Sequence, residues 1–446
     1  MQSVPPVAVR PVPATIDRAS LLVLGAAAFM AQADARVIDA LLHVVAVDFH
    51  TVPAQASIVI SAYALPYGLF QLLYGPIGDR IGKLRVMTFC LAFFSVGTFA
   101  CGLVSSLPAF AVLRFLTGAA AAAVVPMSLG YIGDKFAYET RQIALGRFMS
   151  ALMMGQIIGS SLGGVFGDYL GWRNVFFAFG AVALVVTVML AREANRFPEI
   201  RQAGRRFTSS MFTVPVGGVV LFVGMLGFAS RFVDGLFLAA GSFLLILALA
   251  TQYGYLLKRP HARVILGTVF SEGFFVFGGL GYLASSLTDR FGVAYSTAGL
   301  MLAGFGIGGL VYSVSVKKLF KRIGDLGILL LGGILLGTAF IAIGLMPNWQ
   351  SFIPLVVLLG MGFYTMHGTL QTRATEMAPE ARGAAISLFA FAFFMGQSAG
   401  PLALGRILEY RGYSAVFVTA GTGLLILVVL ARALFQSLAR PKSSNA

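Results

Sequence analysis

Residues 75–85 of the chain read GPIGDRIGKLR, a short stretch that contains three glycines and four charged residues. It stands between two apolar runs, at about 55–74 and 86–104. Each run has about the length that an α-helix needs to cross the hydrocarbon core of a bilayer. The stretch therefore predicts a tight, polar connection between two membrane-spanning helices.

The composition extends this prediction to the whole chain. Of 446 residues, 58% are hydrophobic and 11% are charged, whereas soluble domains carry about 25% charged residues. In hydrocarbon the backbone must satisfy its own hydrogen bonds, which leaves helices or a closed barrel. The apolar runs have helix length and lack the alternation of barrel strands, so we expect an all-α polytopic membrane protein.

The apolar runs divide into six, two and six. The first six lie at about 19–44, 55–74, 86–104, 109–131, 142–167 and 172–191, two central runs at 211–229 and 233–257, and the last six at 263–286, 295–316, 326–346, 350–371, 383–406 and 414–436. The predicted organisation is a tail at 1–18, a six-helix bundle at 19–191, a basic linker at 192–206, an inserted transmembrane hairpin at 207–257, a second six-helix bundle at 258–436 and a tail at 437–446.

The Lys and Arg residues orient this topology. With the N-terminus in the cytoplasm, 25 of the 32 Lys and Arg residues fall in cytoplasmic loops and tails, and five fall outside. Such a bias is typical of membrane proteins, so we expect both termini in the cytoplasm of a bacterial-type inner membrane. A single central span would place the basic residues at 317–322 outside. Both central runs therefore span or neither does, and their length favours fourteen helices over twelve.

The same loops explain the net charge of +15 without a nucleic-acid partner. Residues 1–17 lack the charged segment, short apolar run and small-residue cleavage site of a signal peptide, so the first span is expected to remain in the protein. Cys90 and Cys101 lie in one apolar run and are interpreted as packing residues.

The quoted stretch resembles the signature loop of the major facilitator superfamily, Gly-x-x-x-Asp-Arg-x-Gly-Arg/Lys. The matching residues are Gly75, Asp79, Arg80, Gly82 and Lys83. The resemblance implies that Asp79 and Arg80 form a charge latch that holds the two halves together on the cytoplasmic face. Gly75 would allow close helix approach, and Gly82 a tight turn.

Further segments resemble the same family. The sequence from Arg114 to Gly118 is similar to its fourth-helix element, and residues 155–164 to the fifth-helix antiporter motif, with Ser160 where that motif has proline. Residues 396–401 resemble the counterpart in the second half, and 372–383 the loop before it. The proposed helix-packing residues are Gly155, Gly159, Gly163, Gly164, Gly396, Gly400 and Pro401, although small residues spaced by four are common in membrane helices generally.

This resemblance implies a major facilitator fold with parallel halves and a substrate site between them near mid-membrane. It covers nearly the whole chain except 207–257. A hairpin between the halves is similar to the fourteen-helix drug antiporters, whereas the rest looks more like the twelve-helix efflux group.

Ionisable residues inside the predicted spans are functional candidates, because each costs at least ~2.5–3.5 kcal/mol at mid-helix. The clear cases are Asp34, Arg36, Arg114 and Glu272, and Asp39 lies near a helix end. Arg36 and Asp39 are three residues apart and share a face. Asp34 lies about 160° around the helix from Arg36 and therefore faces another side, at a depth in the membrane similar to that of Arg114.

We therefore hypothesise that an acid of this group binds the coupling proton and that Arg114 tunes it. Glu272 stands alone among aromatic residues and is interpreted as a proton carrier or a site for a cationic substrate. The structural alternative is a protonated Glu272 bonded to a neighbouring carbonyl.

Polar and aromatic residues on the central helices are candidates for the substrate site. They are Gln32, Tyr63, Tyr67, Gln71, Gln156, Phe274, Phe277, Tyr282, Phe389, Phe393 and Gln397. Each aromatic residue alone is equally consistent with packing. As a set they predict a mainly apolar cavity, which suits amphiphilic molecules better than sugars.

The sequence thus predicts a proton-coupled exporter of small amphiphilic or drug-like molecules, monomeric and without a cofactor or metal. Proton-coupled uptake of an organic acid is the alternative, and a non-transporting membrane sensor or scaffold is a remote one. The enzyme-like patterns at 304–309 and 396–400 lie inside apolar runs rather than at strand-to-helix turns. No phosphate-binding loop is present to drive transport with ATP, so the protein is not expected to be an enzyme.

Overall fold

The computed structural model describes residues 18–136, 138–196, 253–378 and 382–439. These residues form helices and no strands. The helices are α1 (Arg18–Asp48), α2 (Pro53–Ala56), α3 (Ile58–Ile81), α4 (Lys83–Cys101), α5 (Leu107–Ala121), α6 (Val124–Lys135), α7 (Tyr138–Val165), the π-helix η1 (Phe166–Leu170), α8 (Trp172–Arg196), α11 (Pro260–Leu280), α12 (Leu283–Phe291), α13 (Tyr295–Leu345), α14 (Phe352–Glu376) and α15 (Arg382–Ala439). The predicted hairpin at 207–257 lies almost entirely outside the described residues.

Two of these helices each contain two spans. Within α13, Gly324 has φ 65° and ψ 180°, and within α15, Gly412 has φ 75° and ψ 178°. Only glycine adopts such backbone without strain. The chain reverses direction at the kink in α13. This follows from the packing of Gly308, before the kink, and Gly332, after it, against neighbouring turns of α14. Of the ten helices long and apolar enough to span, two are therefore double, which gives twelve spans in the described residues.

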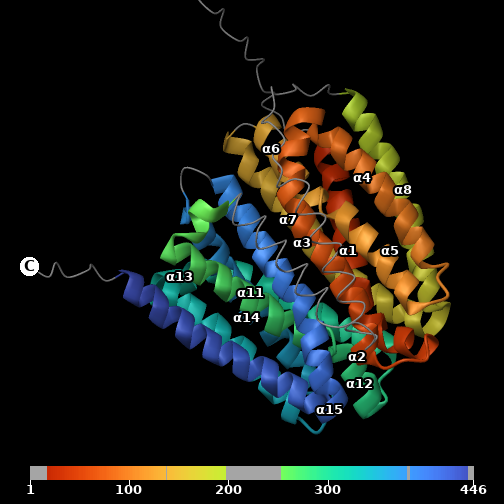
Figure 1. The fold of residues 1–446 in the computed structure, drawn as a ribbon, viewed down its shortest axis with the longest axis vertical. Helices are drawn as coiled ribbons and strands as arrows, with labels where there is room; N and C mark the ends of the chain where they lie inside the picture. Colours follow the sequence, from red (N-terminus) through yellow and green to blue (C-terminus); the bar gives the residue numbers. More distant parts are fainter. Residues whose placement is uncertain (1–17, 137, 197–252, 379–381, 440–446) are drawn as a thin grey trace, which may run out of the picture.

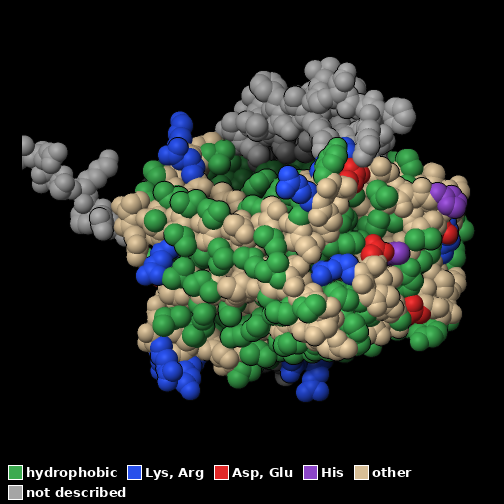
Figure 2. Space-filling view, turned by 90° about the horizontal axis from the view of Figure 1, so that it is seen from below, with side chains coloured by type: hydrophobic (Ala, Val, Ile, Leu, Met, Phe, Trp, Pro, Cys, Tyr) green, Lys and Arg blue, Asp and Glu red, His purple; other side chains and the backbone are tan. Residues whose placement is uncertain are grey.

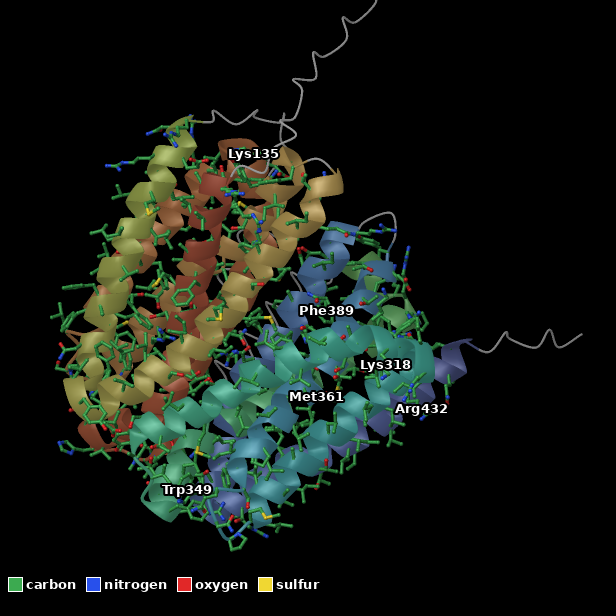
Figure 3. All side chains as sticks on the ribbon, turned by 180° about the vertical axis from the view of Figure 1, so that it is seen from behind. Lys135, Lys318, Trp349, Met361, Phe389 and Arg432 are labelled. Carbon is green, nitrogen blue, oxygen red and sulfur yellow. The ribbon has the colours of Figure 1, made fainter. Side chains whose placement is uncertain are left out.

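The twelve spans form two halves, α1–α8 and α11–α15 (Figure 1). We call the end of the bundle that carries Arg18 and Ala439 the terminal end, and the opposite end the far end. The halves contact each other through α1, α3 and α7 on one side and α12, α13 and α15 on the other. In Figure 3 the ribbons of the two halves spread apart toward Lys135 and Lys318 at the terminal end, away from Trp349 at the far end.

Glycines bring equivalent helix pairs of the two halves into backbone contact. A side-chain carbon at Gly155, Gly159 or Gly163 of α7 would strike a backbone carbonyl of α1. In the second half, Gly396 and Gly400 of α15 approach the backbone of α11 in the same way. Small residues permit this approach, and in lipid such packing is a main source of helix association.

Some predicted boundaries were wrong. Residues 75–81 of the signature stretch are the last turns of α3 rather than a loop, and the turn is confined to Gly82, whose φ of 108° ends the helix. The predicted span 109–131 breaks between α5 and α6, and 263–286 breaks between α11 and α12. At each break an amide bonds three residues back, as Ala123 does to Ala120 and Tyr282 to Gly279.

The outer surface is largely apolar, as expected for a protein surrounded by lipid. Large apolar side chains such as Val314, Phe89 and Leu22 are 85%, 75% and 70% exposed. Hydrophobic side chains cover much of the face in Figure 2, where charged side chains are few. Exposed apolar surface on this scale would aggregate in water, so the chain is a multi-pass membrane protein.

A leucine at Gly159 is expected to destabilise the fold, because its side chain would be forced into the α1 backbone at Ala33. Overpacking of this kind costs about 1–3 kcal/mol. The matched control is Gly146→Leu on the same helix, where the added carbon meets open space. Fluorescence-detected gel filtration after heating should show an earlier loss of the Gly159→Leu peak; equal loss for both variants would contradict the close packing.

Candidate functional site

The most deeply buried charges form an ion pair within the first half. Arg114 of α5 donates from Nη1 to Asp34 Oδ2 at 2.5 Å and from Nη2 to the Asp34 carbonyl at 3.0 Å. Both side chains have no exposed surface. The Arg114 Cζ also lies 4.2 Å from the centroid of the Tyr63 ring. The guanidinium thus joins α1, α3 and α5 through one carboxylate and one aromatic face.

This pair is incompletely satisfied. Within the described part of the chain, Asp34 Oδ1 and Arg114 Nε are buried and have no hydrogen-bond partner. An unpartnered buried carboxylate oxygen is costly, and a proton on that oxygen would lower the cost of its burial. The geometry therefore suits a carboxylate that changes its protonation state.

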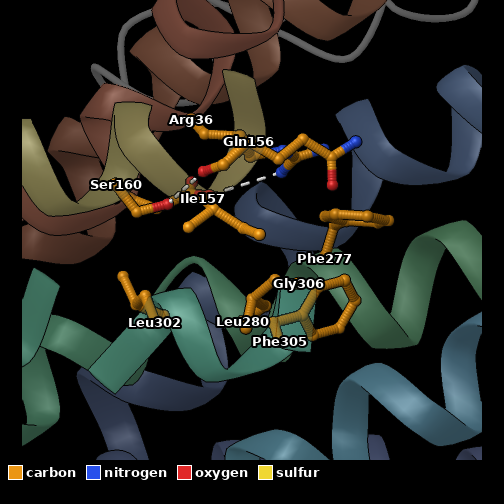
Figure 4. A pocket seen from close by; sticks show the side chains of 10 residues that line it. Arg36, Gln156, Ile157, Ser160, Phe277, Leu280, Leu302, Phe305 and Gly306 are labelled. Atoms are coloured by element: carbon orange, nitrogen blue, oxygen red, sulfur yellow. Dashed lines mark hydrogen bonds and ion pairs between the residues drawn. The ribbon is translucent and has the colours of Figure 1, made fainter. Parts of the chain in front are cut away.

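A second ion pair lies where the two halves meet. Arg36 Nη1 is 3.3 Å from Asp39 Oδ2, and Arg36 Cζ is 4.3 Å from the centroid of the Phe277 ring on α11. Both charged residues line a pocket of about 20 Å³, which has room for about one water molecule. Figure 4 shows Gln156 and Ser160 of α7 on one side of this pocket, and Leu302 and Phe305 of α13 on the other.

A polar bridge crosses the halves beside this pocket. Gln156 Nε2 donates to Gln32 Oε1 at 3.4 Å, and the Tyr364 hydroxyl of α14 donates to Gln156 Oε1 at 3.1 Å. Tyr364 was not among the predicted site residues. The candidates were polar and aromatic residues on the helices expected to be central, and none was taken from the span at 350–371.

Glu272 has a partner that the sequence did not reveal. Its Oε2 lies 2.9 Å from His367 Nδ1 of α14, and Glu272 has no exposed surface. The His367 ring lies 4.6–5.3 Å from the rings of Phe363, Phe389 and Phe393. The prediction treated Glu272 as a lone acid. An ionisable residue inside the predicted span 350–371 was the available signal for His367.

The other predicted substrate residues occupy varied positions. The Tyr63 hydroxyl donates to the Ala31 carbonyl at 3.0 Å, and its ring stacks on Tyr67. The Tyr282 hydroxyl donates to the Pro401 carbonyl at 2.5 Å, which ties the α11–α12 break to α15. Three further candidates remain. Gln71 is partly exposed and lies one turn after Tyr67. Phe274 packs on Phe270 and Phe275, and Gln397 is buried.

Two ion pairs of the signature residue Lys83 lie within the first half. Lys83 is 3.5 Å from Asp79 and also forms an ion pair with Asp134 of α6. These contacts join α3, α4 and α6. The latch between the two halves, involving Asp79 and Arg80, stays a prediction for a state in which the terminal end is closed.

The far end is held by polar contacts between the halves. Asp168, in η1, accepts hydrogen bonds from the backbone amides of Tyr295 at 3.1 Å and Ser296 at 2.7 Å, and so caps the start of α13. His43 of α1 lies 3.1 Å from Asp289 of α12. Carboxylates at helix N-termini are stabilising. These residues were absent from the predicted site, since they flank short loops with no family motif.

Across residues 18–196 without 137, and 253–439 without 379–381, no three His, Cys, Asp or Glu side chains lie close enough to hold a metal ion.

Removing one partner of the Asp34–Arg114 pair is expected to destabilise the protein by about 3–5 kcal/mol, because the other charge stays buried and unpaired. Asp34→Asn and Arg114→Gln should each lower the melting temperature. The double variant should lose less than the sum of the two losses, which would measure their coupling. Strict additivity in thermal unfolding would contradict a direct pair.

Asp168→Ala should loosen the far end. A cysteine at Ser398, which is buried and bonds across the halves to Ser61, reports opening through its reaction with a hydrophilic maleimide once Cys90 and Cys101 are replaced by serine. The rate should rise at least about tenfold, since the variant removes both bonds to Asp168 and each bond to a charged acceptor contributes about 1.5 kcal/mol.

The matched control for this experiment is Asp48→Ala. Asp48 is an acid at the same end whose partner, Arg173 at 2.7 Å, lies in its own half. An unchanged labelling rate in Asp168→Ala, or an equal rise in the control, would contradict the role of the cap.

Comparison with known proteins agrees with this architecture. The sequence profile of the Major Facilitator Superfamily matches residues 24–379 and 264–446. The chain is 26% identical to the uncharacterized MFS-type transporter YceJ of Bacillus subtilis, over 92% of this chain and 94% of that protein. It is 25% identical to the multidrug resistance protein Stp of Mycobacterium tuberculosis (strain H37Rv), over 87% and 75%.

Solved structures show the same fold at low identity. A peptide transporter POT in complex with sulfate superposes with a TM-score of 0.76 at 17% identity, over 96% of this chain and 97% of that chain. A bacterial homolog of the human lysosomal transporter Spinster, in an inward-facing and unoccupied conformation, gives 0.68 at 18%, over 96% and 100%. Together with the twelve spans and the paired halves, the profile match shows that the chain belongs to the Major Facilitator Superfamily and is a transporter rather than an enzyme.

Proposed function

We propose that this transporter exports small amphiphilic molecules in exchange for protons. The observation that carries the proposal is the Asp34–Arg114 pair, which is fully buried and leaves Asp34 Oδ1 without a partner in the described residues. In the ionised state the pair holds α1 against α5. A proton on Asp34 removes half of the charge pair and frees Arg114 to change its contacts.

The position of Asp34 links protonation to the substrate site. Asp34 and Arg36 lie two residues apart on α1, and Arg36 lines the pocket between the halves. Gly159, two turns before the end of α7, packs on the backbone of Ala33. A shift of α1 on protonation is therefore passed directly to α7 and to Gln156.

The apolar environment supports amphiphilic substrates. The pocket between the halves has room for about one water molecule in this state, so a substrate would have to widen it; it combines Arg36, Asp39 and Gln156 with the rings of Phe277 and Phe305. Further aromatic rings surround the Glu272–His367 pair. A few polar anchors among many apolar groups are typical of sites for drug-sized molecules, and one of the similar proteins is named for multidrug resistance.

The orientation follows from the basic residues. We place the terminal end in the cytoplasm of a bacterial-type inner membrane, with the protein acting as a monomer. The far-end contacts through Asp168 and Asp289 then close the external side. That state is ready to take substrate from the cytoplasm, and one proton entering down 100 mV supplies about 2.3 kcal/mol.

An alternative is proton-coupled uptake of an organic acid. It is favoured by one observation, that Arg36 lines the pocket and is balanced there by Asp39 alone among the lining residues described. A substrate carboxylate would compete with Asp39 for the guanidinium.

Everted membrane vesicles with an acid interior separate these proposals. Added lipophilic cations should cause alkalinisation, and Asp34→Asn or Glu272→Gln should abolish it while the protein remains correctly inserted. The matched control is Asp48→Asn, an acid in an exposed ion pair at the far end, which should retain activity. Accumulation of an organic acid in right-side-out vesicles, with no response in everted ones, would establish uptake and overturn export.

A further inference from the structure

A groove at the terminal end has no part in the proposed transport pathway. It lies over α1 between α7 and α8 and has a volume of about 600 Å³. Leu22 and Val182 on its walls are 70% and 49% exposed, so it opens on the outer surface of the first half. The pocket of Arg36 and Gln156, in contrast, lies between the halves.

The groove is charged at one end and apolar along the rest. Among its lining residues, all within the described chain, Arg18 and Arg147 are the charged ones. They lie within one helical turn of each other in height, because Gly25 meets Ala151 and Phe29 meets Gly155, a parallel register that sets Arg147 beside Leu21. Both arginines are exposed. The deep end is formed by Phe29, Met30 and Val182.

The length of the groove matches one leaflet of a bilayer. From Arg18 to Met30 the rise of α1 is ~18 Å, and half of the hydrocarbon core is ~15 Å. Glu193 of the flanking helix α8 is buried and hydrogen-bonded to Ser20, so this acid does not face the groove opening.

We propose that this groove binds an anionic phospholipid from the leaflet at the terminal end, with the phosphate between Arg18 and Arg147 and an acyl chain along α1 to Met30. Two exposed cations above an apolar wall of leaflet depth complement this molecule in both charge and length. The chain end would stop one helical turn before Asp34, at the α1–α7 seam.

Native mass spectrometry of the full chain tests the proposal. The purified protein is mixed with phosphatidylglycerol and phosphatidylcholine of identical acyl chains. The wild type should retain phosphatidylglycerol preferentially. Arg18→Ala/Arg147→Ala should bind it about 25-fold more weakly, since each cation near the surface contributes about 1 kcal/mol.

A charge-matched control and a second variant make the test specific. Lys318→Ala/Arg322→Ala removes two exposed cations from the terminal end of the other half and should keep the preference. Val182→Trp fills the groove but retains both arginines, and should also lose the lipid, which tests the site even where the arginine variant folds poorly. Equal retention of the two lipids by the wild type, or undiminished retention in Val182→Trp, would overturn the proposal.

Discussion

Hydrocarbon offers no hydrogen-bond partners, and every charged or polar group of this transporter is placed under that constraint. Asp34 is buried against Arg114, Arg36 against Asp39, and Glu272 against His367. Each pair joins two helices or two turns of one helix. A proton that entered such a pair would change how helices are held, which is the physical basis of the proton coupling that we propose.

The backbone obeys the same constraint through glycine. Where α7 lies on α1, and α15 on α11, glycines allow the helices to approach until carbonyls and Cα atoms are in contact. This seam runs beside Asp34 in the first half and beside Glu272 in the second, since Gly273 packs on Phe393. The acids thus lie beside closely packed contacts in each half, where a small displacement is transmitted with little loss.

Much of the fold was predictable from the sequence, because long apolar runs identify membrane spans and basic loops identify their orientation. The fold class and the family followed from runs of the right length and from residues 75–85. The Asp34–Arg114 contact was expected from matching depths. His367 was not counted among the ionisable residues inside the spans, and its pairing with Glu272, like the cap formed by Asp168, depends on tertiary contacts between distant helices. The break near Ala122 lies four residues before Pro126, which has no amide to donate to the Ala122 carbonyl, whereas the break near Gly281 carries no proline.

The contact between α7 and α13 at the far end has a mechanical consequence. Gly164 lies against the backbone of Tyr295, and Gly299 against that of Ser160, so the two helix surfaces are smooth at these positions. Such surfaces slide or rotate past one another without rotamer changes. Movement at this contact is therefore resisted by the polar contacts at its edge, such as the hydrogen bonds from the Tyr295 and Ser296 amides to Asp168.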